Sequence, residues 1–133
     1  NVLSDAQRMQ CCCDNVHFLG HLIPAEVAEI NNIADVGVIP SRSEGFCIAG
    51  LETIACGTPI VMTDAARVAE YAVAAVVAVE NPQQLAAAIV RLLNSPVRKQ
   101  QQLRHQALQS AAQFTWENIV ARRLAYYDEL SRL

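Results

Sequence analysis

The chain has 133 residues, of which 53% are hydrophobic, 17% are charged and only 5% are aromatic, and its formal net charge is −3. This length is enough for one domain with one aliphatic core. The acidic balance disfavours nucleic acid and anionic membranes as partners. No apolar run reaches the roughly 20 residues that a membrane-spanning helix needs.

Apolar periodicity and capping residues predict helices and strands that alternate along the chain. Asn81 before Pro82 is a strong helix start, and Gly57 before a nearby proline marks a helix end. The predicted helices cover 4–13, 24–33, 48–57, 81–93, 95–114 and 115–133, and the predicted strands cover 15–20, 35–40, 59–63 and 75–79. Strand 35–40 is a continuous apolar run, which predicts burial on both faces. We therefore expect an α/β domain with a Rossmann-like parallel sheet of about four strands, right-handed crossovers and flanking helices, two or three of them at the C-terminus.

The five cysteines admit two interpretations. One is a metal or redox cluster at the adjacent Cys11, Cys12 and Cys13. We favour the other, small apolar residues in a reducing cytoplasm, because zinc needs spaced ligands and no CxxC pair occurs. Cys47 and Cys56 lie among apolar residues.

The C-terminal helices are rich in basic residues, which form either a binding patch or, as we favour, a solvated face balanced by nearby acidic residues. These basic residues are Arg91, Arg98, Lys99, Arg104, Arg122 and Arg123. The last predicted helix also has an apolar stripe, which consists of Trp116, Ile119, Val120, Leu124 and Tyr127.

The most informative stretch joins strand 35–40 to helix 48–57 and reads SRSEGFCIAGLE. Ligands of open parallel sheets bind off the carboxyl ends of the strands. Unpaired amides of Phe46, Cys47 and Ile48 at the start of the helix would suit phosphate oxygens. Gly45 would let the backbone turn sharply and approach a ligand.

Two carboxylates, Glu44 and Glu52, flank these amides. A carboxylate accepts hydrogen bonds through two oxygens and matches a vicinal diol. The corner therefore offers acceptors for hydroxyls at its two ends and donors for phosphate between them, which is the outline of a sugar–diphosphate–ribose molecule. The alternative is that Glu44 caps the helix and Glu52 is merely exposed to solvent.

The chain resembles the C-terminal, nucleotide-sugar-binding domain of retaining GT-B glycosyltransferases of the family 4-like type. The resemblance runs through VHFLGHLIPAEVAEINNIADVGVIPSRSEGFCIAGLETIACGTPIVMTD, AEY, NPQQLAAAIVRLLNSP and AAQFTWENIVARRLAYYDEL. It centres on the Glu-x7-Glu element formed by Glu44 and Glu52. It implies transfer of a sugar from a UDP-, GDP- or ADP-sugar donor to an acceptor hydroxyl, with retention of configuration and without a metal ion or other cofactor.

The resemblance also implies roles for single residues. Glu44 would be the catalytic residue that approaches hydroxyls of the donor sugar, and Glu52 would bind the ribose diol. The other donor-binding residues that it implies are Gly45, Phe46, Cys47 and Ile48 at the diphosphate, and His21, Leu22 and Ile23 at the base, largely through their backbone.

The match departs from the family in four respects. The basic segment that clamps the diphosphate has no counterpart, and Arg42 is near the corner but does not match it. We expect the N-terminal acceptor domain to be absent, and AARVAE replaces a glycine-rich stretch. Cys47 stands where the family has glycine, and we expect it to add a side chain at the phosphate approach.

We therefore expect residues 1–133 to be a single, truncated donor-binding domain that is catalytic only within a longer protein. The alternative is a non-catalytic relative that serves as a binding or assembly module. An open sheet edge predicts self-association. We expect no nucleic-acid partner, no transmembrane segment and a cytoplasmic location, with peripheral attachment of a full-length protein to a membrane left open.

Overall fold

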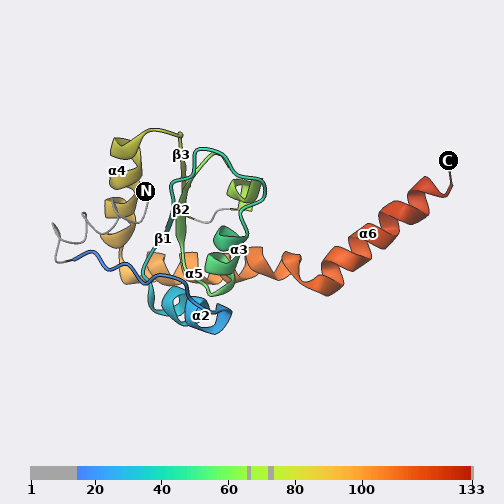
Figure 1. The fold of residues 1–133 in the computed structure, drawn as a ribbon, viewed down its shortest axis with the longest axis horizontal. Coiled ribbons are helices and arrows are strands. Elements are labelled where there is room, and N and C mark those ends of the chain that lie inside the picture. The colour runs from blue at the N-terminus through green and yellow to red at the C-terminus, as the bar shows by residue number, and fades with distance from the viewer. Residues whose placement is uncertain (1–14, 66, 72–73, 133) are drawn as a thin grey trace.

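The computed structural model describes residues 15–65, 67–71 and 74–132. A three-stranded parallel sheet in the order β1-β2-β3 lies between helices (Figure 1). The strands are β1 (Gly37–Ile39), β2 (Ile60–Thr63) and β3 (Ala75–Val77). The α-helices are α2 (Pro24–Ile33), α3 (Ile48–Ala55), α4 (Pro82–Leu93), α5 (Val97–Ala111) and α6 (Trp116–Leu130). Two short 3-10 helices, η1 (Arg67–Tyr71) and η2 (Ala112–Phe114), complete the described elements. The predicted Rossmann-like α/β class is confirmed.

The predicted strand 15–20 is wrong, so the sheet has three strands in the described part of the chain instead of four. Residues 15–20 are exposed, and no ladder joins them to β1. A strand exists only through hydrogen bonds to a neighbour, so the apolar pattern alone did not suffice. The predicted helix 4–13 lies outside the described residues.

Helix ends follow the local sequence closely. The side chain of Asn81 accepts a hydrogen bond from the Gln84 amide (3.0 Å), and that of Thr115 accepts one from the Asn118 amide (3.3 Å). Each cap side chain accepts a hydrogen bond from a backbone amide of the first helical turn, which has no acceptor within the helix. Gly57 has a φ of +76° just after α3, the left-handed conformation that glycine adopts most readily at a helix end.

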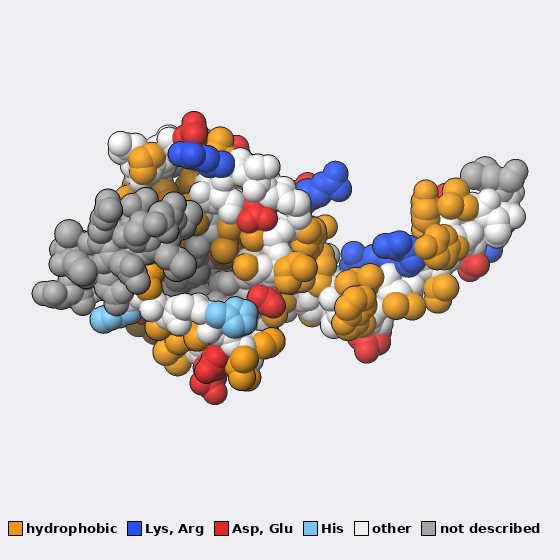
Figure 2. Space-filling model, in the orientation of Figure 1, with side chains coloured by type: hydrophobic (Ala, Val, Ile, Leu, Met, Phe, Trp, Pro, Cys, Tyr) orange, Lys and Arg blue, Asp and Glu red, His pale blue; other side chains and the backbone are white. Residues whose placement is uncertain are grey.

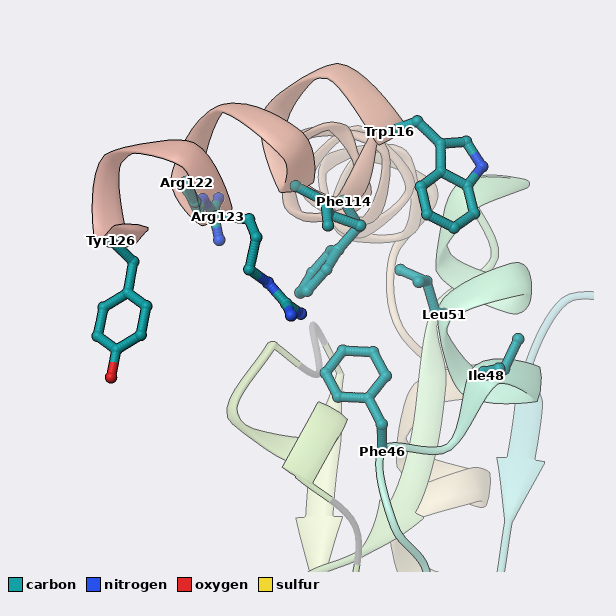
Figure 3. Close-up of a pocket in the computed structure, with 9 residues that line it drawn as sticks. Phe46, Ile48, Leu51, Phe114, Trp116, Arg122, Arg123 and Tyr126 are labelled. Atoms are coloured by element: carbon teal, nitrogen blue, oxygen red, sulfur yellow. The ribbon is translucent and has the colours of Figure 1, made fainter. Parts of the chain in front are cut away.

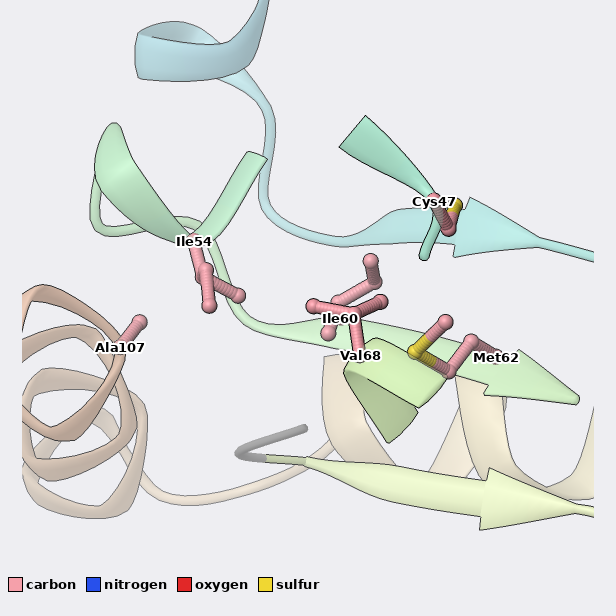
Figure 4. Close-up of a cluster of buried hydrophobic side chains, with 6 residues drawn as sticks. All are labelled: Cys47, Ile54, Ile60, Met62, Val68 and Ala107. Atoms are coloured by element: carbon pink, nitrogen blue, oxygen red, sulfur yellow. The ribbon is translucent and has the colours of Figure 1, made fainter. Parts of the chain in front are cut away.

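The core has two layers, one on each face of β2. Alternate residues of β2 point to opposite faces, so Ile60 and Met62 join one cluster and Val61 joins the other. The first cluster, drawn in Figure 4, consists of Cys47, Ile54, Ile60, Met62, Val68 and Ala107. The second consists of Val61, Val77, Ala88, Leu92 and Leu103. Helices α3 and α4 therefore cover opposite faces of the sheet.

β1 is an edge strand, and the prediction that it is buried on both faces is wrong. Val38 is 37% exposed, and Gly37 and Ile39 are only partly buried. β1 has a single neighbour, β2, in the described sheet, so one side of the strand is left open. A continuous apolar run does not distinguish such an edge from a central strand.

Helix α6 leaves the body of the domain and ends at the C-terminus, as Figure 1 shows. Figure 2 shows hydrophobic side chains gathered along it. Its predicted apolar stripe is largely open to solvent: Trp116 is 78% exposed. The other exposed apolar side chains of α6 are Val120, Leu124, Tyr126, Tyr127 and Leu130. Packing within the described chain therefore leaves most of this helix uncovered.

Truncation of an apolar side chain should lower the free energy of unfolding strongly only where that side chain is buried. Ile54 is 1% exposed and Ile33 is 78% exposed. We expect Ile54→Ala to lower the free energy of unfolding by roughly 2–5 kcal/mol, and the matched control Ile33→Ala to change it by no more than about 0.5 kcal/mol. Urea unfolding followed by circular dichroism measures both, and equal effects would contradict this core.

Candidate functional site

The carboxyl ends of the three strands are tied together at one edge of the sheet. The Thr63 hydroxyl at the end of β2 donates to the Ser41 carbonyl (2.6 Å) after β1. The Asp64 amide donates to the Val77 carbonyl (3.0 Å), and the Asp64 carboxylate accepts from the Val79 amide (3.2 Å). The loops that leave β1, β2 and β3 are thus held against one another, at the edge where ligands of parallel sheets bind.

The strand-to-helix corner is supported from behind by η1, an element that the sequence did not predict. The Arg67 amide donates to the Gly45 carbonyl (3.4 Å), and the Val68 amide donates to the Phe46 carbonyl (3.2 Å). The carbonyl oxygens of Gly45 and Phe46 are therefore already hydrogen-bonded within the protein.

Helix α3 begins immediately after the corner. Cys47 is its N-cap residue, and its side chain makes no capping hydrogen bond. The first amides of a helix have no acceptor within the helix, so those of Ile48 and Ala49 remain available to a ligand. Glu44 does not cap this helix; its carboxylate accepts a hydrogen bond from the Ser41 hydroxyl instead (2.9 Å).

The side chain of Cys47 does not lie at the phosphate approach, where the sequence led us to expect it. The thiol is 7% exposed and packs in the first core cluster, so it does not project into the phosphate approach. The residue has a φ of +70°, a left-handed conformation that costs a non-glycine residue about 1–2 kcal/mol. Burial of the side chain in this cluster offsets part of this cost.

The two glutamates and Gly45 lie on the open surface. Glu44 and Glu52 are both exposed, Glu44 before the corner and Glu52 in the middle of α3. An added Cβ at Gly45 would meet no atom within 4 Å, and Gly45 is not in the left-handed region. The protein itself therefore does not require glycine here, and the space in front of Gly45 is open.

The segment predicted to meet the base precedes α2. His21 is exposed, Leu22 is partly buried and Ile23 is 57% exposed. The Ile23 amide already donates to the Glu26 carboxylate (2.8 Å). The backbone donors left for a ligand in this segment are those of His21 and Leu22.

Several basic side chains of the domain are engaged in contacts. Arg42 forms an ion pair with Glu80 at the carboxyl end of the sheet (3.2 Å), and both side chains are well exposed. Arg104 is partly buried and donates to the Ala34 carbonyl (2.9 Å), so it ties α5 to the end of α2. The interpretation of the basic residues as a merely solvated face does not hold for Arg104.

A cavity of about 730 Å³ opens between α3 and α6 (Figure 3). It contains Phe46 and Ile48 of the predicted donor site, but not Glu44, Glu52 or the 21–23 segment. The other residues that line it are Leu51, Phe114, Trp116, Ile119, Arg122, Arg123 and Tyr126. Sequence reasoning missed this cavity, although the spacing of Trp116, Ile119 and Arg123 on one helix face was a signal for it.

The comparisons with known proteins agree with this fold. Residues 3–95 match the family model described as glycosyl transferases group 1, and the chain belongs to this family. An MMP alpha-(1->4)-mannosyltransferase from Mycolicibacterium hassiacum is 33% identical over 122 residues, which cover 87% of this chain and 29% of the relative. A D-inositol 3-phosphate glycosyltransferase from Acidothermus cellulolyticus is 35% identical over 122 residues, which cover 87% of this chain and 26% of the relative.

The solved structure of sucrose-phosphate synthase from Thermosynechococcus elongatus matches with a TM-score of 0.81 and 25% identity, over 98% of this chain and 34% of that one. The resemblance to GT-B glycosyltransferases is thereby confirmed. The chain spans only about a quarter to a third of the length of these relatives.

Within the part of the chain that the structure describes, no group of three or more His, Cys, Asp or Glu residues could hold a metal ion. None of the described helices has both the length and the apolar character needed to cross a bilayer. Cys47 and Cys56 are free thiols.

The strained backbone at Cys47 predicts an unusual order of stabilities. Both Cys47→Gly and Cys47→Ala lose the packing of the thiol, but only alanine keeps a Cβ in the left-handed region. We expect Cys47→Gly to be more stable than Cys47→Ala by about 1 kcal/mol. Chemical unfolding of the two variants side by side measures this, and an alanine variant that is the more stable would contradict the conformation of the corner.

Proposed function

We propose that the chain is the donor-binding part of a retaining glycosyltransferase, which takes a sugar from a nucleoside diphosphate and transfers it to an acceptor hydroxyl. One observation supports this most directly: the uncapped start of α3 lies between two exposed carboxylates at the carboxyl edge of the sheet. Helix amides are donors for phosphate oxygens, and carboxylates are acceptors for hydroxyls. Each part of the donor thus has a group of matching chemistry.

The assignment of roles follows the same chemistry. Glu52 would accept hydrogen bonds from the ribose diol, and Glu44 would accept them from hydroxyls of the donor sugar, as the catalytic residue. The amides of Phe46, Cys47 and Ile48 and the open face of Gly45 would meet the diphosphate. His21, Leu22 and Ile23 would lie against the base.

The reaction needs charge stabilisation more than a nucleophile. Negative charge grows on the leaving diphosphate while the sugar takes on oxocarbenium character, and donors aimed at that charge lower the barrier. The engagement of the Gly45 and Phe46 carbonyls by η1 favours this arrangement. The proposal requires no metal ion or other cofactor.

The relatives are much longer than this chain, so transfer is proposed for a protein that joins this donor-binding domain, residues 1–133, to an acceptor-binding part. A cytoplasmic location belongs to the same proposal. The free thiols of Cys47 and Cys56 support it, because reducing compartments keep cysteines in that form.

A second candidate is a non-catalytic binding or assembly module with the same fold. It is favoured by the engagement of Arg42 with Glu80, because this leaves the arginine nearest the corner paired with a carboxylate. The two candidates differ in donor binding, which only the first requires.

Thermal unfolding with UDP, GDP and ADP, and with their sugar derivatives, separates the two candidates. A ligand at 100 times its dissociation constant should stabilise the native state by about 2.7 kcal/mol. We expect a shift with one of the nucleotides that is lost in Glu52→Ala and kept in Glu129→Ala, a matched change at an exposed helical glutamate far along α6. A clean transition that no nucleotide shifts would contradict the first candidate.

We also propose that the open edge of β1 mediates self-association. The Gly37 amide donates to the Pro59 carbonyl beside it (2.9 Å), so the alternation of a parallel ladder directs the Val38 amide to the open side. An exposed strand edge is a template for another strand.

Sedimentation velocity over a range of concentrations measures this association. We expect dimers in the wild type and fewer dimers in Val38→Pro, since proline removes the outward N–H and is tolerated on edge strands. A wild type that stays monomeric at high concentration, with its fold intact by circular dichroism, would refute the proposal.

A further inference from the structure

The cavity between α3 and α6 shares residues with the proposed donor site. Phe46 and Ile48 belong to the corner that we assign to the diphosphate, and both line the cavity. The ring of Phe46 packs edge-on against Phe114 (5.4 Å between centroids), and Phe114 packs on Tyr71 (4.8 Å). This aromatic contact fixes the wall of the cavity beside the corner.

One face of α6 forms the opposite wall. Trp116, Ile119, Arg123 and Tyr126 follow one another at steps of three or four residues, the spacing that places side chains on one face of a helix. A face that served only to pack on α3 would have an apolar residue at the central position. Instead this position is occupied by Arg123.

Arg123 differs from Arg42 and Arg122 in its contacts. Arg42 is paired with Glu80 (3.2 Å), and Arg122 donates to the Gln113 carbonyl (3.2 Å). For Arg123 no hydrogen bond or ion pair is found within the described residues. Figure 3 shows its guanidinium directed toward the space between Phe46 and Phe114.

The chemistry of this position favours an anion. A guanidinium is always charged, and its planar fork binds phosphate oxygens through paired hydrogen bonds. Apolar walls such as Phe46, Ile48 and Leu51 reduce screening by water and strengthen the field of a cation beside them. The cavity therefore adds a positive charge to a corner whose own donors are backbone amides.

We propose that Arg123 of α6 supplies positive charge for the diphosphate of the donor. The inference rests on the proposed function, because it assigns a residue to the same site. The Arg122 guanidinium donates to the Gln113 carbonyl and so connects α6 to η2. The charge would come from the C-terminal helix, on the side of α3 away from Arg42.

Isothermal titration of the full 133-residue chain with UDP, GDP and ADP, and with uridine, guanosine and adenosine, tests this inference. We expect Arg123→Gln to weaken binding of the preferred diphosphate roughly tenfold, as expected for one charge-assisted contact, and to leave the nucleoside within about twofold. Arg123→Lys should recover part of the loss, because the charge remains but the fork does not. Arg132→Gln is the matched control, since it removes the same charge from an exposed position just beyond the end of α6.

The outcomes separate the inference from the proposed function. If the wild type binds a diphosphate and Arg123→Gln binds it equally well, Arg123 does not meet the phosphate. The same conclusion follows if Arg132→Gln weakens binding as much, or if the nucleoside is weakened as much as the diphosphate. If the wild type binds none of the three diphosphates, the proposed function fails and this inference fails with it. Thermal unfolding of each variant shows whether it is folded.

Discussion

The geometry of the site depends on the burial of β2. All four of its residues are buried, with Ile60 and Met62 facing one layer of helices and Val61 facing the other. The last of them, Thr63, uses its hydroxyl to hold the Ser41 carbonyl at the start of the corner. The interior of the domain thus fixes the loop in which Glu44 lies. Loss of packing around β2 would displace the corner even though no corner residue had changed.

Local signals predicted a large part of this architecture. Asn81, Thr115 and Gly57 act within a few residues of themselves, and α4, α6 and the end of α3 follow from them. The 15–20 segment shows where such signals fail, because its apolar pattern is that of a strand while strand formation depends on a neighbour elsewhere. The edge position of β1 escaped prediction for the same reason.

The sequence likewise predicted one part of the candidate site and not another. The corner, its two carboxylates and the start of α3 at Ile48 could be predicted, because all lie within twelve consecutive residues. The support from η1 and the buried thiol of Cys47 could not, because both depend on contacts across the fold. The cavity with Arg123 joins residues about 75 positions apart, and only the packing of α5 on α3, continued through η2 into α6, brings them together.

Two carboxylates around a strand-to-helix corner have a chemical reason in a donor-binding site. Glu44 and Glu52 contribute little to the core, since both are exposed, and Glu44 does not cap α3. Between them are amides with few acceptors of their own, and the cavity adds Arg123 on one side. Acceptors at the ends and positive partial charge in the middle would complement a molecule with hydroxyls at its ends and phosphate in its middle.

The most direct measurement is a titration of the ¹⁵N-labelled chain with UDP, GDP and ADP, followed by the amide resonances in two-dimensional NMR. The account predicts that the largest changes for the binding nucleotide occur at the amides of Phe46, Cys47 and Ile48, with smaller changes at His21 and Leu22. Binding with its largest changes elsewhere, and with these three amides unmoved, would contradict the assignment of the corner to the diphosphate.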